Sequence, residues 1–187
     1  DFQRAYPNIE IRILTVEDPH RLDLAEFDLG IYYHVPNEVD PPGLVADAIF
    51  EHERVAAVCS PIYLERHGNG IEPAHLLVNH TLMVVEDHYH DRLSWEIWFR
   101  ELGLKWQPPL HTLRANSFQL LMNATLAGQG VTLGWMRLLD AELRQGNLVQ
   151  ALPLTIPSRG KLSLFTPQHR HLTEPMRAFR HWVLDTN

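Results

Sequence analysis

The sequence predicts an α/β protein, in which short buried strands alternate with helices. The segment Val55 to Cys59 is apolar and rich in β-branched residues, and it stops at Ser60-Pro61, as a buried strand does. A second observation is a set of aromatic and apolar residues at positions i, i+3, i+4 and i+7, the spacing of a helix: Trp95, Trp98, Phe99 and Leu102. The third is an apolar, capped segment from Ser117 to Ala127.

The first third of the chain predicts mainly strands. Asp1 to Tyr6 is interpreted as the end of a helix that stops at Pro7-Asn8. Ile9, Ile11 and Ile13 then alternate with charged residues, which is the pattern of a half-buried strand. Asp28 to Tyr33 predicts a further short strand, and an apolar run from Leu44 to Phe50 follows it.

Helices and strands alternate in the middle of the chain. Pro61 to Arg66 predicts a short helix capped by Ser60, and Leu82 to Val85 predicts a strand. Gly103 is expected to end the tryptophan-containing helix. Asn116 is the expected N-cap of the next helix, with Gln119 in the capping-box position.

The last third continues the alternation. Val131 to Leu133 and Leu162 to Phe165 predict strands. Between them, apolar residues at helical spacing predict a helix that ends at Gly146. Thr173 is the expected cap of a terminal helix that has Pro175 in its first turn.

Composition excludes several classes of protein. The 187 residues carry 16 Lys plus Arg against 23 Asp plus Glu, a formal charge of −7, which disfavours strong binding of nucleic acid by this chain alone. Cys59 is the only cysteine, so no disulfide forms within the chain. No apolar run approaches the roughly 18 residues of a membrane span, and no secretory leader is recognised. The chain starts at Asp1 without Met and is expected to be a fragment.

Six segments, in order along nearly the whole chain, resemble the effector-binding (substrate-binding) domain of LysR-type transcriptional regulators. Each segment is weakly specific by itself, and the resemblance depends on their order and spacing. The segments are Tyr6–Ile11, Phe27–Ile31, Val58–Leu64, Ala127–Val131, Gly146–Val149 and Met176–Val183. Pro42-Gly43-Leu44 and the Trp95/Trp98 pair further resemble the subgroup of the glycine-cleavage activator.

The resemblance implies a two-lobed, type 2 periplasmic-binding-protein-like fold, each lobe a mixed sheet flanked by helices. Residues 1–60 plus 163–187 would form lobe I, without its usual first strand, and residues 61–162 would form lobe II. A small effector would bind between the lobes and control DNA binding and transcription by a full-length protein. The winged helix-turn-helix of that protein is absent from this chain.

Six residues are the candidate effector contacts. A helix N-terminus attracts carboxylates and other anions, and the resemblance places Asn116, Ser117 and Phe118 at the cleft. Ser60, Tyr32 and Tyr33 follow or end buried strands, where α/β proteins often place ligand contacts. The subgroup often has Arg where Tyr32 stands, which indicates a different or less anionic effector. Each residue also has a structural reading: a helix cap for Asn116, Ser117 and Ser60, and rim packing for the tyrosines.

No catalytic or metal-binding residue is assigned, and no cofactor is expected. The segment Glu86 to Asp91 holds His88 and His90, but their i, i+2 spacing differs from the i, i+4 pair of a helical zinc site. Cys59 ends an apolar strand and is expected to be an inert buried thiol. The resemblance implies a cytoplasmic ligand-sensing domain, not an enzyme. It would form a homodimer or homotetramer and meet DNA only through the missing domain.

Two alternatives stay open at this point. A solute-binding protein of a transport system shares the same fold class. An enzyme on the same scaffold, such as a metal-assisted hydrolase, would need a bound metal and a base in the cleft. An upstream helix-turn-helix would favour regulation, and a secretory leader would favour transport.

Overall fold

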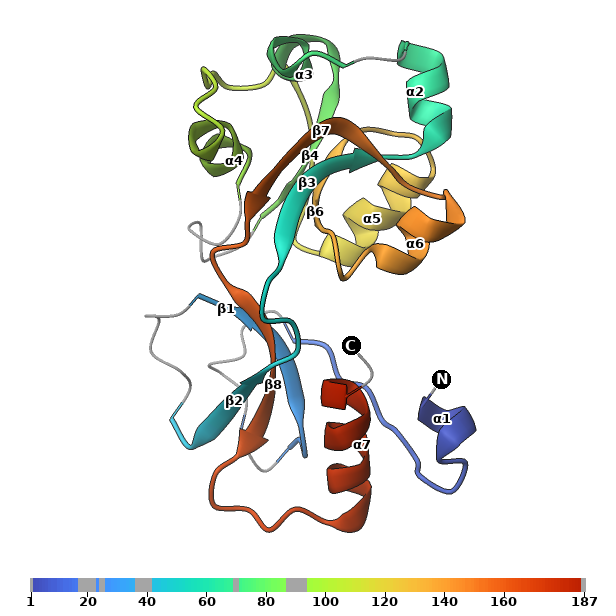
Figure 1. The fold of residues 1–187 in the computed structure, drawn as a ribbon, viewed down its shortest axis with the longest axis vertical. Coiled ribbons are helices and arrows are strands. Elements are labelled where there is room, and N and C mark those ends of the chain that lie inside the picture. Colours follow the sequence, from blue (N-terminus) through green and yellow to red (C-terminus); the bar gives the residue numbers. More distant parts are fainter. Residues whose placement is uncertain are drawn as a thin grey trace. The chain divides into compact units, whose positions relative to one another are not determined.

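The computed structural model describes residues 2–16, 23, 26–35, 42–68, 71–86 and 94–185 (Figure 1). The chain divides into two compact units: unit 1 is Asp1–Glu51 with Gly160–Asn187, and unit 2 is His52–Arg159. From the sequence, the first boundary between the lobes was expected after residue 60. The boundary between the two units follows Glu51, nine residues earlier. The difference arises because strand β3 (Arg54–Cys59) pairs along its length with strands of unit 2.

In unit 1 the structure describes a sheet of three strands. Strand β8 (Lys161–Pro167) lies between β1 (Gly30–His34) and β2 (Leu44–Ala48) and is antiparallel to both. Its described pairs are therefore all antiparallel, where a mixed sheet was predicted. Helix α7 (Glu174–Asp185) packs on this sheet, and Arg180 of α7 contacts Asp47 of β2 at 2.9 Å (Figure 1).

The short helix α1 (Phe2–Ala5) packs on α7 through aromatic rings. The Phe2 ring lies edge-on to Phe179 and Trp182, with centroids 5.1 and 5.5 Å apart. The strand predicted at Ile9, Ile11 and Ile13 is wrong, since residues 9–16 lie in no helix or strand and Ile13 is 81% exposed. A strand needs partners for its backbone N–H and C=O groups, and no described strand pairs with this segment.

The described residues of unit 2 form five strands, and four of them run in the same direction. Strands β4 (Thr81–Val85) and β5 (His111–Ala115) are parallel, and a parallel bridge from Leu82 to Val131 connects β4 to the start of β6 (Thr132–Trp135). Strand β3 lies antiparallel between β6 and β7 (Val149–Pro157). The carboxyl ends of β4, β5 and β6 consequently meet at one edge of the unit.

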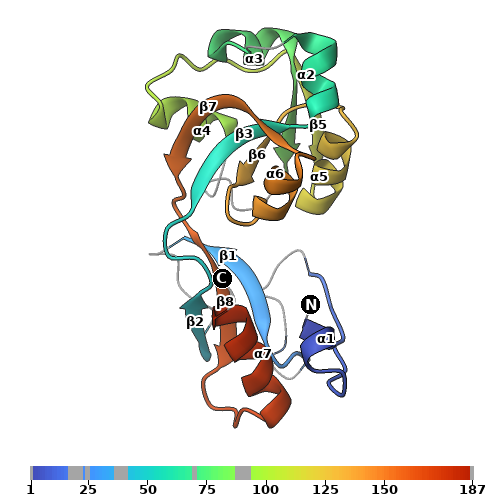
Figure 2. The same cartoon turned by 45° about the vertical axis from the view of Figure 1, so that its right-hand side comes forward.

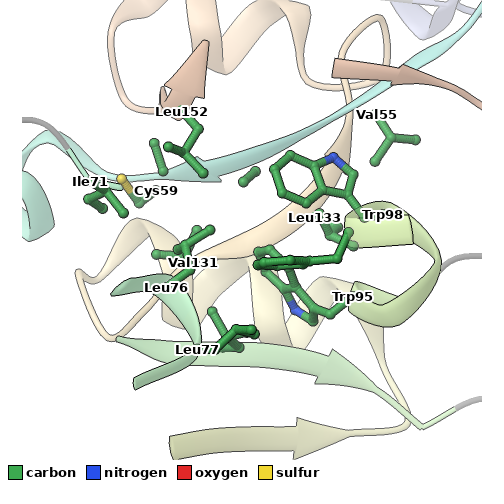
Figure 3. Packing of buried hydrophobic residues seen from close by; sticks show 14 of the residues in the cluster. Val55, Cys59, Ile71, Leu76, Leu77, Trp95, Trp98, Val131, Leu133 and Leu152 are labelled. Carbon is green, nitrogen blue, oxygen red and sulfur yellow. The ribbon is translucent and has the colours of Figure 1, made fainter. Parts of the chain in front are cut away.

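Both faces of β3 are buried, so helices must cover both. Val55, Ala57 and Cys59 face one apolar cluster, to which α3 (Pro73–Asn79) and α4 (Trp95–Glu101) contribute (Figure 3). Ala56 and Val58 face the other, formed with α5 (Phe118–Leu126) and α6 (Asp140–Gln145). Figure 2 shows these helix pairs on opposite sides of the strands. The buried strand predicted at Val55 to Cys59 is confirmed.

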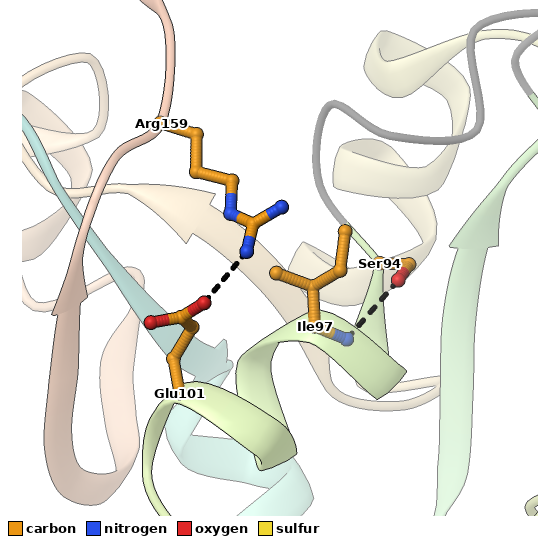
Figure 4. Close-up of polar contacts among 4 residues, drawn as sticks. All are labelled: Ser94, Ile97, Glu101 and Arg159. Atoms are coloured by element: carbon orange, nitrogen blue, oxygen red, sulfur yellow. Dashed lines mark hydrogen bonds and ion pairs between the residues drawn. The ribbon is translucent and has the colours of Figure 1, made fainter.

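Helix α4 is fixed at both of its ends (Figure 4). The Ser94 hydroxyl accepts a hydrogen bond from the Ile97 N–H at 3.2 Å and caps the start of the helix. At the other end, Glu101 pairs with Arg159 at 2.6 Å. Both charged side chains are about 40% exposed, so the ion pair adds little stability, and burial of Trp98 and Phe99 stabilises the helix instead. The predicted helix is confirmed.

Two further helices were predicted correctly, whereas three elements were not predicted. Helix α2 (Pro61–His67) and the C-terminal helix form as predicted. Strand β7 was not predicted, because Pro153 and Pro157 interrupt its apolar pattern. Proline is tolerated there because β7 is at the edge of the β6-β3-β7 sheet. Helix α3 and strand β5 were also not predicted.

Gly130 allows β4 and β6 to approach closely, and its replacement gives a test of this packing. A Cβ atom at Gly130 would lie 2.4 Å from the Thr81 carbonyl oxygen, which itself accepts the Val131 N–H at 2.9 Å. We expect Gly130→Ala to lower the free energy of unfolding by about 1 to 3 kcal/mol, the usual cost of overpacking. Urea denaturation followed by far-UV circular dichroism measures it. Gly30→Ala is the control, because its Cβ would meet only ordinary contacts, the nearest 3.5 Å away; equal losses in both variants would contradict the explanation.

Candidate functional site

The carboxyl edge of unit 2 is where the parallel strands end. Strands β4 and β5 end at Val85 and Ala115, which pair with each other, and the Glu86 N–H donates to the Ala115 carbonyl at 2.8 Å. Strand β6 ends at the same edge with Trp135. In α/β proteins ligands commonly bind beyond the carboxyl ends of parallel strands, so this edge is the candidate binding site.

Helix α5 begins at this edge, one residue later than the sequence predicts. Ser117 is the N-cap, and its hydroxyl accepts the Leu120 N–H at 3.4 Å. The prediction that Asn116 caps the helix is wrong, because Asn116 connects the end of β5 to the cap. The predicted capping box is absent as well. Gln119 instead donates from its side chain to the Asn123 side chain at 3.3 Å, one helical turn further on.

An aromatic pair borders this helix N-terminus. The Phe118 ring lies edge-on to Trp135, with centroids 5.3 Å apart. The Trp135 indole N–H donates to the Ser158 hydroxyl at 3.3 Å, which fixes the ring relative to the end of β7. Phe118 was predicted as a site residue, whereas Trp135 was not. Its position at the carboxyl end of a predicted strand is the signal that would have found it.

Charged groups at this edge are of both signs. Arg114, the penultimate residue of β5, lies 3.9 Å from Glu86, and both side chains are more than half exposed. Such a pair contributes little to stability. Glu53 is buried, and its carboxylate accepts the N–H groups of Arg54 and Arg137 at 2.8 and 3.1 Å. It therefore fastens the turn after β6 to the start of β3.

Ser60 lies at the opposite edge of unit 2. Because β3 is antiparallel to β6, its carboxyl end lies beside the start of β6, with Val58 opposite Thr132. The Ser60 hydroxyl lies next to Gly128, beyond the C-terminal end of α5. Nine residues of helix, about 13 Å, separate that end from Ser117. The structure therefore does not bring Ser60 together with the α5 N-terminus.

Ser60 is nevertheless unusual in its surroundings. It occupies the N-cap position of α2, as predicted, but its side chain makes no capping hydrogen bond. The residue is 2% exposed, and its hydroxyl has no hydrogen-bond partner among the described residues. The predicted side-chain cap at Ser60 is therefore wrong.

Tyr32 and Tyr33 belong to unit 1 and lie on opposite faces of its sheet, since consecutive residues of a strand alternate. Tyr32 lies near Phe165, with ring centroids 6.2 Å apart. The Tyr33 hydroxyl accepts the Gly160 N–H at 2.8 Å, at the point where the chain re-enters unit 1. The two tyrosines therefore do not line one common surface of this unit.

Cys59 and the His, Asp and Glu side chains are the groups that could support catalysis or metal binding. Burial raises the pKa of Cys59 to about 12, which makes its thiol a poor nucleophile, as predicted. Within the described ranges, no group of three His, Cys, Asp or Glu side chains is arranged to hold a metal ion. His88 and His90 lie outside those ranges. Among the helices that the structure describes, none has the length and apolar character to cross a membrane.

Comparison with known proteins gives one family over the full length of the chain. Residues 1–187 match the LysR substrate binding domain. The glycine cleavage system transcriptional activator of Escherichia coli K12 is 28% identical over 187 residues, which are 98% of this chain and 57% of that protein. Its homolog from Haemophilus influenzae is 29% identical and covers 100% of this chain and 58% of that protein. The chain thus spans less than two thirds of these relatives.

Solved structures show the same fold. The effector domain of the transcriptional regulator AmpR of Pseudomonas aeruginosa superposes with a TM-score of 0.73 at 26% identity, covering 99% of this chain and 84% of that one. The regulatory domain of CrgA, a LysR-type regulator from Neisseria meningitidis, gives a TM-score of 0.69 at 20% identity, with 99% and 87% covered. At that identity the second likeness concerns the fold alone.

The cap assignment can be checked by its effect on stability. Ser117→Ala removes the side chain that accepts the Leu120 N–H, so the free energy of unfolding should fall by about 1 kcal/mol. Ser117→Asp should retain stability, because a carboxylate also caps a helix and interacts favourably with its dipole. Chemical denaturation of the two variants beside the wild type measures this. Equal destabilisation by Ala and Asp would show that Ser117 is not the cap.

Proposed function

The chain belongs to the LysR substrate binding domain family, and we propose that it senses a small effector on behalf of a transcriptional regulator. The fold is the type 2 periplasmic-binding-protein-like fold of LysR effector-binding domains, which are regulatory domains and not enzymes. The similar full-length proteins are transcriptional activators, and this chain corresponds to 57% of one of them. DNA binding is accordingly assigned to the remaining part of the regulator.

The observation that carries the proposal is the α5 N-terminus at the carboxyl edge of unit 2. The first N–H groups of a helix lack intrahelical partners and carry partial positive charge, so they bind a carboxylate without a buried counter-charge. Ser117 and Asn116 add polar side chains at this turn. Phe118 and Trp135 provide an apolar surface beside it. The arrangement suits a small effector with one anionic group and a short apolar part.

The structure supports the other three predicted effector contacts to different degrees. Tyr33 remains a candidate from unit 1, and Tyr32, which faces the other side of its sheet, remains a weaker one. Ser60 is left out, because it lies at the opposite edge of unit 2 from the α5 turn. We also propose that the regulator works in the cytoplasm as a homodimer or homotetramer. A transport-associated solute-binding protein is the second candidate, and the similarity to known activators favours regulation over it.

The effector proposal is tested by isothermal titration calorimetry with free amino acids and small mono- and dicarboxylates as probes. Glycine is included because two similar proteins activate a glycine cleavage system. For the probe that binds, Ser117→Ala should weaken affinity about fivefold, the loss of roughly 1 kcal/mol expected for one hydrogen bond. Ser117→Asp should weaken it more than tenfold, because its carboxylate repels an anion a few ångströms away.

Gln129→Asp is the matched control. It adds the same charge to an exposed residue beyond the other end of α5, so binding should be unchanged. Wild-type affinity in Ser117→Asp would remove the anion site from this turn. Equal losses in Ser117→Asp and Gln129→Asp would mean that net charge, and not the site, controls binding. Failure of every probe would reject small carboxylates as the effector class.

The second expectation concerns DNA. The 187-residue chain should not bind duplex DNA in a sequence-selective way, because its charge of −7 offers few cations to neutralise phosphates. Fluorescence anisotropy with labelled duplexes of different sequence, at low and physiological salt, measures this. Salt-sensitive and sequence-selective binding by the purified chain would overturn the assignment of DNA binding to the rest of the regulator.

A further inference from the structure

Three aromatic side chains of unit 2 form a compact cluster far from the carboxyl edge. Tyr63 of α2 stacks on His67 one turn later, with ring centroids 4.3 Å apart, and His67 lies edge-on to His80 at 5.5 Å. The Tyr63 hydroxyl and the His80 Nδ1 atom are 3.1 Å apart. Tyr63 is 2% and His80 5% exposed. His80 directly precedes β4, so the cluster joins α2 to the α3–β4 junction.

The direction of the Tyr63–His80 hydrogen bond follows from the surroundings of the phenol. Burial raises the pKa of Tyr63, against a smaller opposite effect from a hydrogen bond with the Thr81 backbone, so the phenol is protonated at neutral pH. The phenol hydrogen is buried and needs an acceptor, and His80 Nδ1 is the hydrogen-bond partner that the described residues give this hydroxyl. His80 Nδ1 is therefore the acceptor, and His80 is neutral with its hydrogen on Nε2.

A proton on His80 is incompatible with this arrangement. Protonated Nδ1 is a donor and no longer an acceptor, so the buried phenol hydrogen would lose the acceptor that it has at neutral pH. The charge would also be placed in a buried site. Burial lowers the pKa of His80, and the nearby charges of His67 and His75 lower it further.

The titratable groups around His80 add no compensating negative charge. His67 comes from α2 and His75 from α3, and both are exposed to solvent. His111 of β5 pairs with Thr81 and is exposed. Cys59 of β3 is near enough to Tyr63 to interact with it electrostatically. Its thiol is neutral, because burial raises its pKa to about 12. A proton on His80 would therefore have no negative side chain among these groups to offset its charge.

We propose that Tyr63, His67 and His80 form an acid-sensitive latch, which holds α2 on the α3–β4 junction at neutral pH and releases it on acidification. The pKa of His80 is lower in the folded state than the value of about 6.5 in an unfolded chain. The latch thus makes its full contribution to the free energy of unfolding above the unfolded-state pKa of about 6.5. This contribution is lost as the pH falls from there toward the pKa of His80 in the folded state. The cluster lies away from the effector site, because His80 precedes β4 whereas the α5 turn lies beyond the opposite end of that strand.

Hydrogen exchange of the α2 amides tests the latch in the 187-residue chain. After correction for intrinsic rates, the opening equilibrium of α2 should rise between pH 7.5 and 5.5 by up to about tenfold per pH unit, the limit for a single proton. His80→Asn should abolish most of this rise, because its side-chain oxygen still accepts the phenol hydrogen but does not titrate. His52→Asn, an exposed histidine at the start of unit 2, should behave as wild type.

Two further measurements keep the proposal falsifiable if His80→Asn does not fold. Tyr63→Phe removes only the hydroxyl, so α2 should already exchange faster at pH 7.5 and respond less to acid. Nuclear magnetic resonance titration of wild-type His80 should give a pKa below 6.5 that coincides with the loosening of α2. A pH-independent α2 in the wild type would overturn the latch. The same acid response in His80→Asn or in Tyr63→Phe as in the wild type would overturn it as well.

Discussion

Burial of both faces of β3 is the constraint on which the rest of unit 2 depends. Val55, Ala56, Ala57, Val58 and Cys59 are all fully buried, so neither face can be left to solvent. Each of the two valines contributes about 1.5 to 3 kcal/mol when it is removed from water, and helices on both sides are needed to achieve this. The pair α3 and α4 covers one face, and α5 and α6 cover the other.

The position of the candidate site follows from this covering. Helix α5 can pack on the β3 face only by running back from the end of β5, so its N-terminus lies at the edge where the parallel strands end. Trp135, the last residue of β6, reaches the same edge and packs against Phe118. The polar N–H groups and the apolar rings therefore come together as a consequence of strand direction.

Sequence patterns anticipated the elements whose burial is continuous or whose helical spacing is strong. β3 and α4 belong to this class, and so does α5, although its start was misplaced by one residue. Asn116 and Ser117 are both good caps, and only the end of β5 at Ala115 decides between them. The Ile9–Ile13 alternation failed because a period-two pattern describes a side-chain preference, whereas a strand also needs a neighbour. The sequence grouped Ser60 with the α5 turn, but pairing direction, which no local pattern encodes, places it beside Gly128.

The same strand direction separates the two chemical inputs proposed for the domain. Strand β4 begins at Thr81, beside the imidazole of His80, and ends at Val85, beside Ala115 and the α5 turn. Its backbone is held along its length by β5 and at its start by Val131. Coupling between two sites requires an element with two arrangements that both ligands bias. Helix α2 places the buried Tyr63 at the start of β4, so the proposed acid response and the proposed effector site lie at opposite ends of this one strand.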